Sequence, residues 1–112
     1  MKLEHAILDL WLDDPEILKF IHPLKEIVTT ASIKGGANII HEKWHQFTPF
    51  GVTGFLLLQE SHISIHTWPE EEFAAIDIFP CGSMDTSLII DILLNELKPK
   101  DKKIARTYRG KA

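Results

Sequence analysis

A group of polar side chains in the middle of the sequence has the types that nucleophilic and acid–base catalysis use. Glu60 and Ser61 stand at a predicted turn, and His66 follows five residues later. Thr53 lies on the strand before the turn, and Cys81 comes fifteen residues after His66. Each also has an ordinary structural explanation, because serine is common in turns, strand histidines are usually hydrogen-bonded structural residues, and a buried cysteine is a small hydrophobe. Their spacing alone leaves the choice open.

Two pairs of histidines raise the question of a metal site. His41 and His45 are four residues apart, and so are His62 and His66. On a strand that rises ~3.3 Å per residue, positions i and i+4 lie about 13 Å apart, too far for both side chains to bind one ion. We therefore expect no metal.

The elements that must position these residues begin with a strand and a broken helix. Residues 3–12 are rich in Ile, Leu and Trp and alternate imperfectly, which is typical of a strand. Residues 13–16 supply an N-cap, a proline at the first helical position and an early carboxylate, and they predict a helix that ends near the glycines at 35 and 36. Pro23 removes a backbone donor, so we expect this helix to be kinked or divided near His22.

Short strands joined by tight turns make up most of the remaining chain. We expect them at residues 37–47, 52–59, 63–67, 73–79 and 102–108. Asp85 is suited to cap an amphipathic helix that runs through Leu97. This order of elements predicts an α+β fold: a two-layer sandwich in which two helices pack on one face of a mainly antiparallel sheet.

Length and composition restrict the class of protein. The chain has 112 residues, 45% of them hydrophobic, which is enough for one core, so we expect a single domain over residues 1–112. Asp91 interrupts the apolar run at residues 88–94, far short of the ~20 residues of a membrane span, and the N-terminus has no signal-peptide pattern. The lone Cys81 excludes an intrachain disulfide. We expect a soluble, cytoplasmic protein that does not bind a membrane.

Charge is distributed unevenly along the chain. Residues 44–97 contain no Lys or Arg but hold eight of the 16 carboxylates, whereas residues 98–112 hold seven of the 12 cations. A site within residues 44–97 would favour a cationic ligand and would offer phosphate no positive side chain, so we expect no nucleic-acid partner. A solvated surface on which charges fell unevenly explains the same pattern more simply, and it also accounts for the basic C-terminus.

Residues 60–70 carry the most specific signal in the sequence. The segment Glu-Ser-His-Ile-Ser-Ile-His-Thr-Trp-Pro-Glu closely resembles the processing-site motif of the prokaryotic S-adenosylmethionine decarboxylases, pyruvoyl enzymes that supply an aminopropyl donor for spermidine synthesis. The resemblance continues upstream through residues 45–47 and 51–54, and downstream through residues 74–77 to the Cys-Gly pair at 81–82.

The resemblance implies that the chain cleaves itself between Glu60 and Ser61, which leaves residues 1–60 and residues 61–112 as separate chains. In this family the serine hydroxyl attacks the preceding carbonyl to form an ester, and removal of the serine α-proton then eliminates that ester. The serine is thereby converted to a pyruvoyl group and ammonia is released. The pyruvoyl ketone condenses with the substrate amine and accepts the electrons released with carbon dioxide, as pyridoxal phosphate does.

The same match assigns roles to five further residues. His66 accepts a proton during processing, and Thr53 stands where the family typically has a serine that supports it. Cys81 donates a proton to carbon after decarboxylation, a role that a protonated thiol can fill. Phe47 matches the position that stacks on adenine, and Glu70 matches the position that holds the ribose hydroxyls.

The resemblance further implies S-adenosylmethionine as the substrate and a homodimer with sites at or near the subunit interface. Thr53, Glu71-Glu72 and Pro80 differ from the residues usual in the family, and they flank the substrate side. The same mechanism acting on another cationic amino acid, such as ornithine or arginine, is therefore an alternative. A second alternative is an unprocessed, non-catalytic relative that serves as a binding partner.

Overall fold

A single antiparallel sheet of six strands dominates the computed structural model, which describes residues 2–80 and 82–111. The strands lie in the order β2-β3-β4-β5-β1-β6, and every neighbouring pair is antiparallel. Their bounds are β1 (Lys2–Trp11), β2 (Ile39–Gln46), β3 (Val52–Leu58), β4 (His62–Trp68), β5 (Phe73–Phe79) and β6 (Asp101–Gly110).

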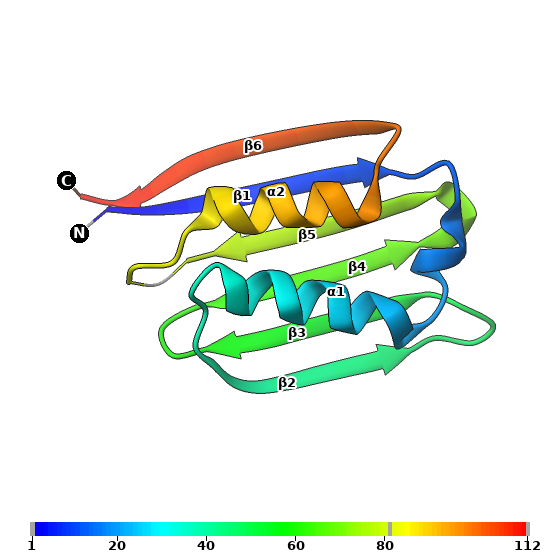
Figure 1. Cartoon of the computed structure of the whole chain (residues 1–112), viewed down its shortest axis with the longest axis horizontal. Helices are drawn as coiled ribbons and strands as arrows, with labels where there is room; N and C mark the ends of the chain where they lie inside the picture. The colour runs from blue at the N-terminus through cyan, green and yellow to red at the C-terminus, as the bar shows by residue number, and fades with distance from the viewer. Residues whose placement is uncertain (1, 81, 112) are drawn as a thin grey trace.

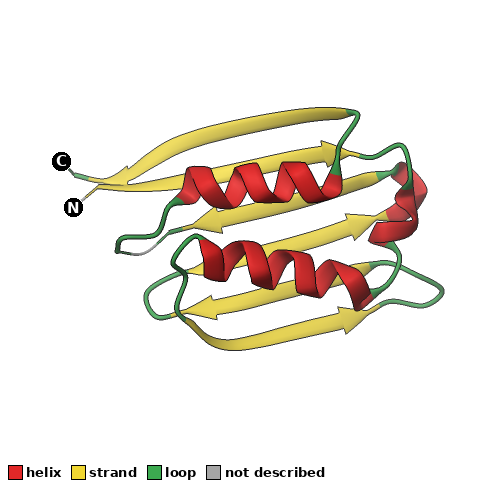
Figure 2. Ribbon diagram, in the orientation of Figure 1, coloured by secondary structure: helices red, strands yellow, loops and turns green. Residues whose placement is uncertain are grey.

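Two α-helices cover one face of this sheet (Figure 1, Figure 2). They are α1 (Ile21–Lys34) and α2 (Thr86–Leu97). Of two short 3-10 helices, η1 (Pro15–Leu18) lies between β1 and α1, and η2 (Pro69–Glu71) lies between β4 and β5. The predicted α+β sandwich, with two helices on one face of an antiparallel sheet, is confirmed. None of the helices in the described part of the chain combines the length and the apolarity that a membrane span needs.

Alternation along the strands gives the sheet two different faces. Under the helices, Leu8 and Leu10 of β1 and Ile63 and Ile65 of β4 are fully buried. The opposite face, called the helix-free face below, carries the alternate residues of the same strands. These are His5, Ile7, Asp9 and Trp11 of β1, Thr53, Phe55 and Leu57 of β3, His62, Ser64, His66 and Trp68 of β4, and Phe73, Ala75, Asp77 and Phe79 of β5.

The first helix is divided, as predicted: η1 ends at Leu18, and the first turn of α1 is broken at His22. Asp14 Oδ1 accepts a hydrogen bond of 3.1 Å from the backbone N–H of Glu16 and so caps η1. His22, before Pro23, has extended backbone angles (φ −100°, ψ 138°), because the proline ring clashes with a helical conformation of the residue before it. The hydrogen bond between His22 Nδ1 and the Glu26 carboxylate lowers the pKa of Glu26 below its ordinary value.

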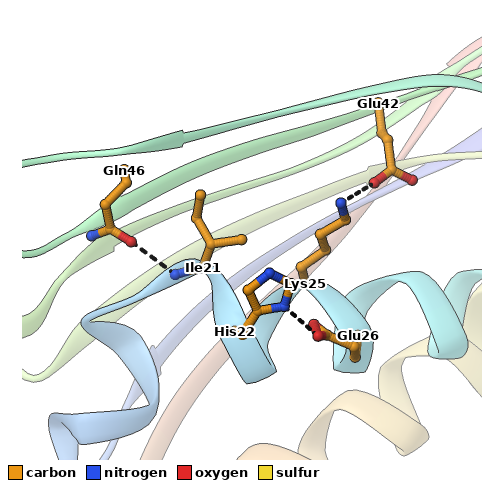
Figure 3. Close-up of polar contacts among 6 residues, drawn as sticks. All are labelled: Ile21, His22, Lys25, Glu26, Glu42 and Gln46. Atoms are coloured by element: carbon orange, nitrogen blue, oxygen red, sulfur yellow. Dashed lines mark hydrogen bonds and ion pairs between the residues drawn. The ribbon is translucent and has the colours of Figure 1, made fainter.

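Polar contacts fasten α1 to the edge strand β2 (Figure 3). The side-chain oxygen of Gln46 accepts a hydrogen bond of 2.9 Å from the backbone N–H of Ile21, and the Lys25 ammonium lies 3.0 Å from the Glu42 carboxylate. Both contacts join the helix to the strand that leads into the next turn, so the position of that turn depends on α1.

Candidate active site

The predicted cleavage bond lies at the hairpin between β3 and β4. The backbone N–H of Leu58 donates to the carbonyl of Ser61 (2.9 Å), which closes the turn. Glu60 is exposed, whereas Ser61 is half-buried, and its hydroxyl donates a hydrogen bond to the backbone carbonyl of Phe79 on β5. This hydrogen bond ties the serine hydroxyl, which directly follows the predicted cleavage bond in the sequence, to β5.

Thr53 and His66 face each other across the β3–β4 ladder. They are register partners on the helix-free face, and Thr53 Oγ1 lies 3.0 Å from His66 Nδ1. When Nδ1–H donates to the hydroxyl oxygen, Nε2 keeps its lone pair and can take up a proton. The structure thus places a hydroxyl where it can orient this imidazole ring.

Ser61 and His66 stand at opposite ends of β4. Five residues of extended strand separate them, which corresponds to about 16 Å at ~3.3 Å per residue. Proton transfer requires a hydrogen bond of about 3 Å. One chain alone therefore does not bring its own serine and histidine together.

A cavity of about 430 Å³ surrounds the Thr53–His66 pair. Its lining residues are Phe47, Phe50, Gly51, Thr53, His66, Thr67, Trp68 and Glu70. Phe47 and Glu70, the two residues predicted to contact substrate, therefore lie in the same cavity as the two predicted to assist processing. An aromatic, partly apolar wall with one carboxylate is suited to a planar, cationic ligand.

Gln46 fixes the turn that presents Phe47 to this cavity. Its side-chain amide donates to the carbonyls of Lys19 (2.8 Å) and Gly51 (3.0 Å), and the backbone N–H of Phe47 donates to the same Gly51 carbonyl (2.8 Å). Gly51 has φ +115°, which a residue with a side chain rarely adopts. The glycine and the glutamine therefore set the direction in which Phe47, 47% exposed, points.

Aromatic side chains gather at both ends of the helix-free face. At the Ser61 end the Phe79 ring lies between His5 (centroids 5.3 Å apart) and His62 (5.8 Å). At the cavity end Trp68 stacks on Phe73 with centroids 5.5 Å apart. Aromatic rings therefore lie near Ser61 at one end of this face and near His66 at the other.

Family models and known proteins identify this arrangement. The family model described as S-adenosylmethionine decarboxylase matches residues 4–110. The chain belongs to the S-adenosylmethionine decarboxylase family. It is 43% identical to S-adenosylmethionine decarboxylase proenzyme 2 of Bacillus cereus over 108 residues, which cover 96% of this chain and 88% of the relative. It is 37% identical over 107 residues to the corresponding proenzyme of Thermodesulfovibrio yellowstonii, covering 95% and 79%.

A solved structure supports the family assignment at the level of the fold. The crystal structure of the adenosylmethionine decarboxylase from Aquifex aeolicus superposes with a TM-score of 0.88 at 32% sequence identity, and the match covers 98% of this chain and 92% of that chain. The similarity to this family is therefore not confined to residues 60–70 but covers nearly the whole chain.

Several parts of the site were not predicted from the sequence. Phe50 and Trp68 line the cavity, although alternation along β4 did place Trp68 on the same face as His66. Cations also approach the site from outside the cation-free segment: Lys19 lies 5.2 Å from the centroid of the Phe50 ring, and Arg109 lies 5.3 Å from that of Phe79. The contact between Arg109 and Phe79 depends on the order and register of the strands, so it could not be predicted from the sequence.

The glutamates after the motif have separate surroundings. Glu70 lines the cavity, whereas Glu72 turns to Lys100, whose ammonium donates to its carboxylate at 2.8 Å. This hydrogen bond raises the pKa of Lys100 above its ordinary value. Glu72, one of the residues that differ from those usual in the family, is thus paired with a cation from outside the cation-free segment. Cys81, the predicted proton donor, lies outside the described residues.

The described residues also bear on the question of a metal. No group of three His, Cys, Asp or Glu side chains among residues 2–80 and 82–111 is placed to share an ion. His41 and His45 on β2 are both exposed.

Proposed function

We propose that this chain is a proenzyme that cleaves itself between Glu60 and Ser61, converts Ser61 to a pyruvoyl group and then decarboxylates S-adenosylmethionine. The relatives at 37–43% identity are named as proenzymes, which agrees with self-processing. The observation that carries the proposal is the cavity that gathers Phe47, Thr53, His66 and Glu70 into one site.

The processing steps use groups of the chain itself. The Ser61 oxygen bonds to the Glu60 carbonyl carbon as the C–N bond breaks, and the hydroxyl proton passes to the released amine. A base then removes the Ser61 α-proton, and the Glu60 carboxylate leaves. The dehydroalanine that remains tautomerises and is hydrolysed, which releases ammonia. His66, held by Thr53, has the imidazole that this elimination needs.

A homodimer supplies the contact that one chain lacks. A two-fold axis through the middle of the helix-free face exchanges its two ends, so the Ser61 end of one chain lies over the His66 end of the other. The face has the apolar side chains that such an interface needs. Those at least 40% exposed are Ile7, Phe55, Leu57 and Trp68.

Substrate recognition follows from the same cavity. Phe47 stacks on the adenine ring, and the Glu70 carboxylate accepts hydrogen bonds from the ribose hydroxyls. The aromatic wall formed by Phe50 and Trp68 favours the sulfonium cation. The pyruvoyl group at residue 61 supplies an electron sink for the carboxylate that leaves as carbon dioxide. Cys81 then delivers the proton to carbon.

The two products of cleavage stay joined by the sheet. β1 and β3 belong to residues 1–60, whereas β4, β5 and β6 belong to residues 61–112. β3 pairs with β4, and β1 pairs with both β5 and β6. Strands of the two products are therefore interleaved, with β1 of the first product between β5 and β6 of the second, and neither product has a complete core alone.

Mass spectrometry of the denatured protein tests the processing. We expect two fragments that meet at Glu60–Ser61 in the wild type and one intact chain in Ser61→Ala. Purified protein should then release carbon dioxide from S-adenosylmethionine. Release from ornithine or arginine alone would refute the substrate, and an intact wild-type chain without activity would refute the proposal as a whole.

Mixing two inactive variants tests the dimer. Ser61→Ala and His66→Ala should each process poorly alone. When they are co-expressed, His66 of the first variant should serve Ser61 of the second, so that only the His66→Ala chain is cleaved. If co-expression gives no cleavage although the two variants form a heterodimer, the shared site is wrong.

A further inference from the structure

We propose that Phe79 is a positioning residue for self-cleavage and that Arg109, from the last strand, holds Phe79 in place. The inference rests on the self-processing proposed above. It gives β6 (Asp101–Gly110), which lies outside the processing motif, a part in the first chemical step.

Phe79, on β5, contacts the reacting serine and side chains from three other strands. Its backbone carbonyl accepts the hydrogen bond from the Ser61 hydroxyl. Its ring lies 5.3 Å from the His5 ring on β1 and 5.8 Å from the His62 ring on β4, measured between centroids. The Arg109 guanidinium carbon lies 5.3 Å from the centroid of the same ring. The side chains of His5, His62 and Arg109 therefore hold Phe79 in place, and Phe79 in turn holds the Ser61 hydroxyl.

The hydrogen bond to Phe79 directs the nucleophile. Because the Ser61 proton points at the Phe79 carbonyl, the lone pairs of the hydroxyl oxygen remain available for the Glu60 carbonyl carbon. The step that follows is an isomerisation: the O–C bond forms, the C–N bond breaks and the proton moves to the amine, without a further reactant. Small displacements of a reacting group slow such steps strongly. A shift of the Phe79 main chain would move the acceptor and with it the hydroxyl.

Arg109 is available for this role, in contrast to its neighbour Arg106. Among residues 2–80 and 82–111, no carboxylate lies within ion-pair distance of the Arg109 guanidinium. Arg106 instead contacts Glu4 (3.4 Å) and donates to the Ser87 hydroxyl (3.1 Å). The two arginines lie on the same strand with different partners, so Arg106→Gln is a matched control for Arg109→Gln.

The rate of cleavage of newly translated chain tests the inference. A cation over an aromatic ring at an exposed site contributes about 0.5–1 kcal/mol, which corresponds to a two- to fivefold change in rate. We expect Arg109→Gln to slow cleavage by this factor, Arg109→Lys to restore part of it, and Arg106→Gln to cleave like the wild type. Phe79→Leu, which removes the ring, should slow cleavage at least as much. Thermal melting of each variant shows that it is folded.

Hydroxylamine identifies the step that is affected, because it cleaves esters much faster than amides. If Arg109 acts on ester formation, hydroxylamine gives Arg109→Gln no extra cleavage, whereas it cleaves the ester that accumulates in His66→Ala. Wild-type cleavage rates in Arg109→Gln, equal slowing in Arg106→Gln, or hydroxylamine rescue of Arg109→Gln would each overturn the inference alone. A wild-type chain that is never cleaved overturns the proposed function as well.

Discussion

The hydrogen bond between Thr53 and His66 gives the most direct test of the processing chemistry. Thr53→Val keeps the shape of the side chain and removes the hydroxyl that lies 3.0 Å from His66 Nδ1. One such hydrogen bond contributes about 0.5–1.5 kcal/mol. Since ~1.4 kcal/mol is tenfold in rate, we expect chain cleavage to slow about two- to tenfold. Removing the imidazole itself should cost more, about 10²- to 10⁴-fold.

The assay follows the masses of newly translated chains over time. Thr53→Ser keeps the hydroxyl and serves as the control, so it should cleave at close to the wild-type rate. Thr53→Val should add no further loss to His66→Ala, because the two residues act through one hydrogen bond. Equal cleavage by Thr53→Val and wild type, or a full additional loss in the double variant, would refute the reasoning.

Three further predictions concern binding and stability. Phe47→Ala should raise KM for S-adenosylmethionine in steady-state assays, because Phe47 lines the cavity, and it should leave chain cleavage unchanged, because its ring has no group that transfers a proton. Glu72 has φ 56°, a conformation that costs a non-glycine residue about 1 kcal/mol, so Glu72→Gly should raise Tm by a few degrees. This gain should be larger at high salt, where the lost pair with Lys100 is screened. The lowered pKa of Glu26 implies stability that is present above the ordinary glutamate pKa and is lost as pH falls through the folded value. His22→Ala should raise that pKa in an NMR titration and weaken the acid dependence of unfolding.

Local signals predicted most of the elements. Asp14 caps η1 and Asp85 caps α2, as their positions before apolar runs indicated, whereas α1 begins after Phe20 without a side-chain cap; Pro23 marks the break in the first helix. The strand predicted at residues 73–79 has the same bounds in the structure. These features depend on neighbouring residues only, so one sequence is enough to find them.

Contacts between distant strands could not be predicted in the same way. Ser61 and His66 are close in sequence, yet an extended strand holds them about 16 Å apart. Arg109 is far from Phe79 in sequence, yet its guanidinium carbon lies 5.3 Å from that ring. Such distances depend on strand order and register, which a single sequence does not specify. For the same reason, the absence of Lys and Arg from residues 44–97 did not predict that Lys19 and Arg109 lie near the site.

For the proposed self-cleavage, the interleaving of strands from residues 1–60 and residues 61–112 across the sheet has a consequence for the order of folding and cleavage. The intact precursor folds in a unimolecular reaction, whereas cleaved protein that has been denatured must reassemble from separate chains. Its refolding rate therefore depends on concentration, and at low concentration the chains are degraded before they meet. A chain that processes itself as proposed has to complete its folding before the bond breaks, so each molecule has one efficient opportunity to reach its native state.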